Sequence, residues 1–212
     1  MLKLVSINIA LPKMVAFPGI KKKHRTGIYK KPVKEKIFLD LNGFQGDGVG
    51  DPRIHGGEDL AVCGYFTDHF PFWENELERT LEPGAFGENL SLSGINESHI
   101  NVGDKFSLGN AVIEVSQPRQ PCHKLNKVFE FQGMACKVQT TGYTGCYFRV
   151  LKQGWVEPGS EIKKIVEGKG KISIEKINFL MFKDKKNQDL LREVSTQEAL
   201  SFEWREKFKK RL

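Results

Sequence analysis

Alternating apolar and polar residues mark short β-strands through the first two thirds of the chain. In the segment 37–41 three apolar residues share one face, and a glycine-rich turn follows them. Two further alternating runs, 106–108 and 111–115, are separated only by Gly109-Asn110, which is the pattern of a β-hairpin with a two-residue turn. The segment 146–151 alternates in the same way. Short strands at this spacing predict a mainly β fold, arranged as a sandwich or a barrel.

One helix is expected to interrupt these strands. Apolar residues recur every three or four positions between residues 70 and 81, and Thr67-Asp68 before them can cap a helix. Pro71 falls in the first turn, where a proline removes no helical hydrogen bond. The pattern predicts a helix over about 67–81.

The last forty residues have a different character. From Ser173 onward the chain contains no glycine or proline, and its apolar residues fall on two stripes at helical spacing. A capping-box pattern begins at Ser195. We expect two or three short helices, which form a small C-terminal helical domain over 173–212 after a β domain of residues 1–166.

The composition is that of a globular chain. Of its 212 residues, 39% are hydrophobic and 28% are charged, which allows a core and argues against wholesale disorder. No apolar run approaches the roughly 20 residues that span a bilayer. The start of the chain is too short and too interrupted for a secretory signal. We therefore expect a cytoplasmic protein that does not enter a membrane.

The net charge of +7 is unevenly distributed. Residues 1–36 carry ten Lys/Arg and one acid (+9), residues 37–120 carry four and fourteen (−10), and residues 121–212 carry nineteen and eleven (+8). Basic flanks can hold an anionic ligand or a nucleic acid, or can be a solvated surface. The tail aromatics lie on an apolar stripe and the acidic middle repels phosphates, so no nucleic-acid partner is expected.

The four cysteines stand at positions 63, 122, 136 and 146, and none forms a C-x-x-C pair. A zinc ribbon and a disulfide scaffold are therefore disfavoured, and we expect free thiols. Cys122 lies in a loop braced by prolines, between Arg119 and Lys124, whose cations stabilise a thiolate. Such a thiolate can be a nucleophile, a redox group or a soft metal ligand. The alternative is a cysteine that only packs.

Three further segments contain candidate chemistry. His55 and Asp59 lie in a glycine-rich loop and can bind a polar ligand, transfer protons or contact each other structurally. Asn89 follows a Gly-Ala-Phe-Gly-Glu turn and can bind a heterocycle edge or join loop backbone. The basic segment 21–32, which contains Arg25 and Thr26, suits a phosphate or is an exposed loop. No nucleotide-binding glycine motif is present.

Together these motifs resemble the MOSC-domain family, in particular its small stand-alone bacterial members. The segment from about 173 resembles the three-helix domain that follows MOSC in this subgroup. The motifs that carry the resemblance are R-T-G-I at 25–28, G-D and H-G-G-x-D at 46–59, F-G-E-N-L at 86–90, V-G-D at 102–104, P-R-x-P-C-x-K-L at 118–125 and G-x-x-x-R-V-L at 145–151.

The resemblance implies a MOSC-type β-barrel and a bound molybdenum cofactor, a molybdopterin dithiolene with a terminal phosphate. Cys122 matches the cysteine proposed in the family as the protein ligand to molybdenum, which agrees with the softness of a thiolate. The residues expected to bind the cofactor are Arg25, Thr26, His55, Asn89, Arg119, Cys122 and Lys124, and those expected to act in catalysis are Cys122, His55 and Asp59.

The activity that the resemblance implies is molybdenum-dependent reduction of N-hydroxylated compounds, such as hydroxylaminopurine-type bases, amidoximes and hydroxylamines, as a detoxification. An external flavin or iron–sulfur reductase would supply electrons, because the chain has no flavin or cluster motif. The alternative is a carrier that holds sulfur on Cys122 as a persulfide, or stores the cofactor for another enzyme. The amphipathic tail is compatible with a homodimer.

Overall fold

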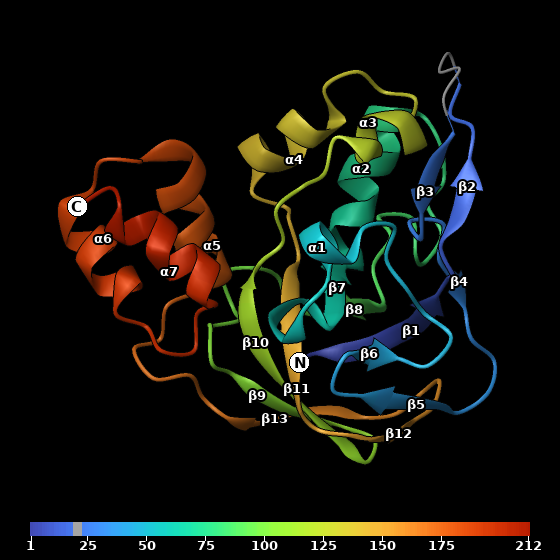
Figure 1. Ribbon diagram of the computed structural model, residues 1–212, viewed down its shortest axis with the longest axis horizontal. Coiled ribbons are helices and arrows are strands. Elements are labelled where there is room, and N and C mark those ends of the chain that lie inside the picture. Colours follow the sequence, from blue (N-terminus) through green and yellow to red (C-terminus); the bar gives the residue numbers. More distant parts are fainter. Residues whose placement is uncertain (19–22) are drawn as a thin grey trace.

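A curled sheet forms the body of the protein (Figure 1). The computed structural model describes residues 1–18 and 23–212, so Lys21 and Lys22 of the basic segment lie outside the described residues. The strands of the large sheet run in the order β13 (Ile162–Val166), β9 (Lys105–Leu108), β10 (Ala111–Pro118), β11 (Cys146–Lys152), β7 (Val62–Phe66), β8 (Leu90–Ser93), β1 (Lys3–Ile9) and β4 (Lys31–Pro32). This half-barrel confirms the predicted mainly β fold.

Two smaller sheets accompany the half-barrel. One consists of β12 (Gly154–Val156), β5 (Ile37–Asp40) and β6 (Gly43–Phe44), and the other of β2 (Lys13–Val15) and β3 (His24–Thr26). The predicted hairpin is confirmed, since Leu108 of β9 pairs with Ala111 of β10. Gly109 in its turn has a φ of +55°, in the left-handed region that a glycine occupies at little cost.

Alternation along β11 decides which side chains face the core. Cys146, Phe148 and Val150 are buried in the main hydrophobic core. Tyr147 and Arg149 consequently lie on the opposite face, where a loop covers the sheet. This covered face becomes one wall of the site described below.

Helices gather at one end of the sheet (Figure 1). They are α1 (Pro52–His55), α2 (Phe70–Leu77), α3 (Lys124–Val128) and α4 (Met134–Thr141), with 3-10 turns at Glu58–Leu60 and Thr67–His69. The helix predicted over 67–81 begins as expected but ends at Leu77. Glu78 adopts a left-handed φ of 50°, and Glu74 accepts the Leu81 N–H at 2.8 Å, so the chain turns back instead of continuing.

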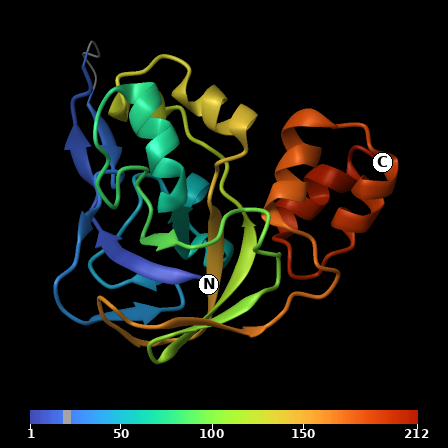
Figure 2. The same ribbon diagram turned by 180° about the vertical axis from the view of Figure 1, so that it is seen from behind.

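The C-terminal helices form a group beside the sheet (Figure 2). They are α5 (Ile174–Asn178), a π-helical turn (Phe179–Lys183), α6 (Gln188–Ser195) and α7 (Phe202–Lys209). The capping box expected at Ser195 is wrong, because Ser195 ends α6 and α7 begins after Ser201. The Ser201 N–H donates to the carbonyl oxygen of Ser116 on β10 at 3.0 Å. This hydrogen bond to the sheet fixes the position at which α7 begins. No helix within the described residues has the length and apolarity to cross a membrane.

The two parts of the chain share one core. Residues such as Ile177, Leu191 and Trp204 belong to the same buried cluster as Ile113 and Phe148 of the sheet. A second, largely aromatic cluster is formed where α2, α3 and α4 pack together, and it consists of Tyr65, Phe70, Trp73, Leu81, Phe86, Leu125, Phe129, Met134 and Val138. Continuous burial of apolar surface therefore holds the C-terminal helices against the half-barrel.

The side chain of Asp104 binds the segment that links the half-barrel to the C-terminal helices. Its fully buried carboxylate accepts the N–H groups of Asn101 at 2.9 Å and Gly168 at 2.8 Å. It also pairs with Lys164 at 2.6 Å. We predict that Asp104→Ala lowers the free energy of unfolding by about 3 kcal/mol, because buried donors lose their acceptor. Chemical denaturation measures this change.

The matched control for Asp104→Ala is Glu167→Ala. Glu167 forms an exposed pair with Lys171, so its loss should change the free energy of unfolding by no more than about 0.5 kcal/mol. Equal effects of the two substitutions would contradict the role assigned to Asp104.

Candidate functional site

The loop that carries Cys122 is fixed at both ends. On one side the N–H of Arg119 donates to the carbonyl oxygen of Gly145 at 3.1 Å. On the other side Leu125 of α3 and Phe129, which follows this helix, are buried in the aromatic cluster. Prolines before and after Arg119 restrict the intervening backbone. The half-buried thiol of Cys122 is consequently presented in a defined direction.

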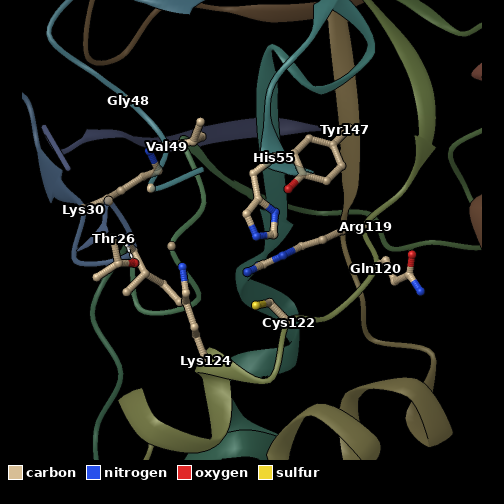
Figure 3. A pocket seen from close by; sticks show the side chains of 14 residues that line it. Thr26, Lys30, Gly48, Val49, His55, Arg119, Gln120, Cys122, Lys124 and Tyr147 are labelled. Atoms are coloured by element: carbon tan, nitrogen blue, oxygen red, sulfur yellow. Dashed lines mark hydrogen bonds between the residues drawn. The ribbon is translucent and has the colours of Figure 1, made fainter. Parts of the chain in front are cut away.

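Cys122 borders a cavity enclosed by loops from separate parts of the chain (Figure 3). Figure 3 shows the side chains of His55, Arg119 and Cys122 converging on it. The side chains that line it belong to Thr26, Ile28, Lys30, Val49, His55, Arg119, Gln120, Cys122, Lys124 and Tyr147. A second cavity of about 640 Å³ adjoins the first and shares His55, Cys122 and Tyr147 with it.

Cationic groups dominate the walls of these cavities. The buried guanidinium of Arg119 donates to the carbonyl oxygen of Phe86 at 2.5 Å. Lys124 donates to the carbonyl oxygen of Arg25 at 3.5 Å, and Arg25 donates to that of Gly50 at 3.2 Å. Within the described residues none of these three cations forms an ion pair with a carboxylate. Their charge is available to an anionic ligand such as a phosphate.

Glycines allow two motifs to form a single wall. A Cβ atom on Gly27 would lie 2.2 Å from the carbonyl oxygen of Gly48, and one on Gly50 would lie 2.3 Å from that of Arg25. No side chain fits at such distances, so glycine is required at both positions. The segment 25–27 and the loop 46–50 therefore pack backbone against backbone at the edge of the cavity.

His55 reaches the cavity from the end of α1. Burial lowers the pKa of its imidazole from the usual value, and the positive charges of Lys124 and Arg119 lower this pKa further. His55 is consequently more acidic, when protonated, than an ordinary histidine. Its position depends on the loop that follows, because Arg149 donates to Asp59 at 2.8 Å and holds this loop on the sheet.

Asn89 lies beneath the cavity, where both ends of its amide are engaged. Its Oδ1 accepts the N–H of Cys63 at 3.1 Å, and its Nδ2 donates to Asp47 at 2.7 Å. Asp47 also pairs with Lys30 at 2.5 Å. Asn89, Asp47 and Lys30 border a further cavity that His55 also lines. Asn89 thus joins loops, which is one of the two roles that its sequence context allows.

The structure brings most of the expected site residues together. Those that line the first cavity are Thr26, His55, Arg119, Cys122 and Lys124, whereas Arg25 lines the adjoining one. Asp59 does not line either of them and instead pairs with Arg149. This ion pair makes Asp59 a residue that positions the His55 loop.

Several residues around the cavities were not predicted from the sequence. Tyr147 lines both cavities, and Gln117 lines the second. The alternation of β11 already separated Tyr147 from the core residues. It did not reveal that a loop 90 residues earlier covers the face on which Tyr147 lies, because that arrangement is set by tertiary contacts.

The chain belongs to the MOSC-domain family, which confirms the resemblance inferred from the motifs. Residues 51–163 match the MOSC domain model, and residues 172–212 match the YiiM-like 3-alpha helix domain. The chain is 44% identical to the protein YflK of Bacillus subtilis over 98% of its own length and 93% of that protein. The crystal structure of YiiM from Geobacillus stearothermophilus is similar over 100% of both chains, with a TM-score of 0.86 and 35% identity.

A third relative is much longer than this chain. A protein of Gibberella moniliformis named "Reductase" is 38% identical over 65% of this chain, but the match covers only 25% of that protein. The region similar to this chain is therefore one part of a larger polypeptide in that fungus.

The cavity residues fit the molybdenum cofactor with which MOSC domains are associated. A half-buried thiol suits a soft metal, and the cations without carboxylate partners suit the phosphate and the anionic chelate. Gly27, Gly48 and Gly50 add no side chains to this wall, so backbone is exposed to a ligand between the side chains of Thr26 and Val49.

We predict that Lys124→Met raises the pKa of His55 toward the ordinary value of about 6.5. The substitution keeps the aliphatic chain but removes a positive charge that disfavours the imidazolium. NMR titration of the histidine ring protons measures the shift. Lys127→Met is the control, since Lys127 lies over the ring of Phe17 and is not among the groups that act on His55. An unchanged pKa in the Lys124 variant would refute this electrostatic coupling.

Proposed function

We propose that this protein binds a molybdenum cofactor through Cys122 and reduces N-hydroxylated compounds. The observation that carries the proposal is the half-buried thiol of Cys122 beside a cavity in which Arg119 and Lys124 have no carboxylate partner among the described residues. Membership of the MOSC-domain family and the reductase name of the fungal relative support it.

In the proposed complex each group has a separate role. The Cys122 thiolate binds the metal, while Arg25, Thr26, Arg119 and Lys124 hold the phosphate and the pterin. When bound, the cofactor would pass the two electrons to the substrate and would supply the Lewis acidity that cleavage of an N–O bond requires. Arg119 is held by its bond to the carbonyl oxygen of Phe86, so its charge is oriented before a ligand arrives.

The proposed reaction converts R–NHOH, two electrons and two protons into R–NH2 and water. The N–O bond breaks, the nitrogen is reduced, and the departing oxygen leaves as water. We assign His55 as the group that delivers a proton to this oxygen, because its ring points into the cavity beside Cys122 and its lowered pKa makes the imidazolium a stronger acid.

The two electrons are proposed to come from a separate flavin or iron–sulfur reductase. The Gibberella relative is consistent with this arrangement, because three quarters of that "Reductase" lie outside the part similar to this chain. We propose that in the present case the electron donor is a separate partner protein.

We predict that Cys122→Ser lowers reductase activity at least about 100-fold, because the metal loses a soft ligand. Protein from a host that makes the cofactor is assayed with hydroxylaminopurine and a chemical reductant, and its molybdenum and pterin contents are measured. Cys136→Ser is the matched control, since this exposed thiol lies on α4. Full turnover by the Cys122 variant would contradict the proposal.

A further measurement on the same wild-type protein distinguishes the reductase function from the carrier function. A wild-type protein that holds cofactor but reduces no N-hydroxylated compound, and that gains a stable extra sulfur on Cys122 after incubation with a cysteine desulfurase, would favour the carrier. A wild-type protein without any molybdopterin would contradict both the reductase and the carrier that stores the cofactor, because in each of them Cys122 binds the metal.

The proton-donor role of His55 predicts a particular pH dependence. Because the pKa of His55 is lowered, its acid form accumulates only below about pH 6.5, and kcat/KM should rise as the pH falls through this pKa. We predict that His55→Gln lowers kcat by about 100-fold and removes this limb of the profile. A variant with the wild-type pH profile would exclude His55 as the donor.

A further inference from the structure

The second cavity lies between the Cys122 loop and the C-terminal helices. Its wall on one side includes Gln117 and Tyr147 of the sheet, and on the other Glu203 and Trp204 of α7. Because Cys122 borders both cavities, a substrate whose N–O group lies near the Cys122 thiol can extend its remaining atoms into the second cavity. The C-terminal helices of the chain thus form part of the wall of the site.

Gln117 is a buried polar residue whose side chain has no hydrogen-bond partner among the described residues. Only 6% of its surface is exposed, and its carboxamide makes no hydrogen bond within the part of the chain that the structure describes. Its polar atoms are nevertheless not sealed in the core, since Gln117 lines both the second cavity and a neighbouring one beside Ser201. Buried carboxamides normally have hydrogen-bond partners, and leaving one unpaired costs about 1–3 kcal/mol.

The sheet register directs this carboxamide toward the site. Gln117 of β10 is the partner of Tyr147 of β11, and paired residues of antiparallel strands place their side chains on the same face. Tyr147 lines the cavity that contains Cys122. Gln117 therefore stands on the face that holds the site, one residue before the proline-braced loop begins.

We propose that Gln117 selects the substrate by binding the ring edge of a nitrogen heterocycle. A carboxamide offers a donor and an acceptor side by side, and this pair matches a ring edge that presents an acceptor and a donor away from the reacting nitrogen, as N3 and N9–H of a free purine base do. The inference rests on the proposed reductase function and adds to it the residue that contacts the ring, so that a substrate large enough to reach from Cys122 to Gln117 is preferred over a smaller one.

The test compares two substrates on holoenzyme with Gln117→Leu, which keeps the volume but removes both polar groups. We expect kcat/KM for hydroxylaminopurine to fall about 10–100-fold, mainly through KM, because the ring edge loses its partner. Turnover of hydroxylamine, which has no ring to reach Gln117, should stay within about twofold of wild type. Gln153→Leu, at an exposed position after β11, is the matched control and should change neither.

Equal losses with both substrates would show that Gln117 only supports the fold, and unchanged kinetics with both would show that it does not touch the substrate. Either result overturns the inference. Binding of adenine, a ring that needs no reduction, is measured in parallel by equilibrium titration. If wild type reduces neither substrate but binds adenine more than about 10-fold more tightly than the Gln117 variant does, the reductase function fails while the role of Gln117 stands.

Discussion

The carboxylate of Asp47 holds together the segments that form the cavity. It accepts the N–H of Ala10 at 2.8 Å, pairs with Lys30 at 2.5 Å and accepts the Nδ2 group of Asn89 at 2.7 Å. The side chains of Lys30 and Asp47 are only 6% and 10% exposed. Charges buried to this extent are tolerated only when they are paired and hydrogen-bonded, so loss of one partner would leave the other uncompensated. The end of β1, the loop 46–50 and the turn before β8 are therefore tied to one point.

This arrangement divides the positive charges of the site into two kinds. Lys30 is neutralised by Asp47 and serves the fold, whereas Arg25, Arg119 and Lys124 bond only to backbone oxygens within the described residues. The uncompensated charges therefore lie where the Cys122 loop meets the backbone wall of residues 25–27 and 46–50. Burial lowers the pKa of His55, and the positive charges of Lys124 and Arg119 lower it further.

The pattern of apolar and polar residues correctly predicted those elements whose conformation depends on neighbouring residues in the sequence. The hairpin at Gly109-Asn110 formed as predicted because both its turn and its alternation agree. The helix end expected at Leu81 and the helix start expected at Ser195 were wrong, because Glu74 captures the Leu81 N–H and β10 fixes Ser201. Residues of the candidate site could be predicted where a sequence motif contains a reactive side chain.

The remaining site residues depend on partners far away in the chain. Asp59 faces Arg149, and Gln117 becomes a wall of the second cavity only because α7 packs opposite it. Neither contact leaves a local signal. The proposed bond between Cys122 and molybdenum is tested most directly by X-ray absorption at the molybdenum edge, which counts bound sulfur atoms in holo-protein. We expect one more sulfur in the wild type than in the cofactor-bearing fraction of Cys122→Ser, and equal numbers would contradict ligation by Cys122.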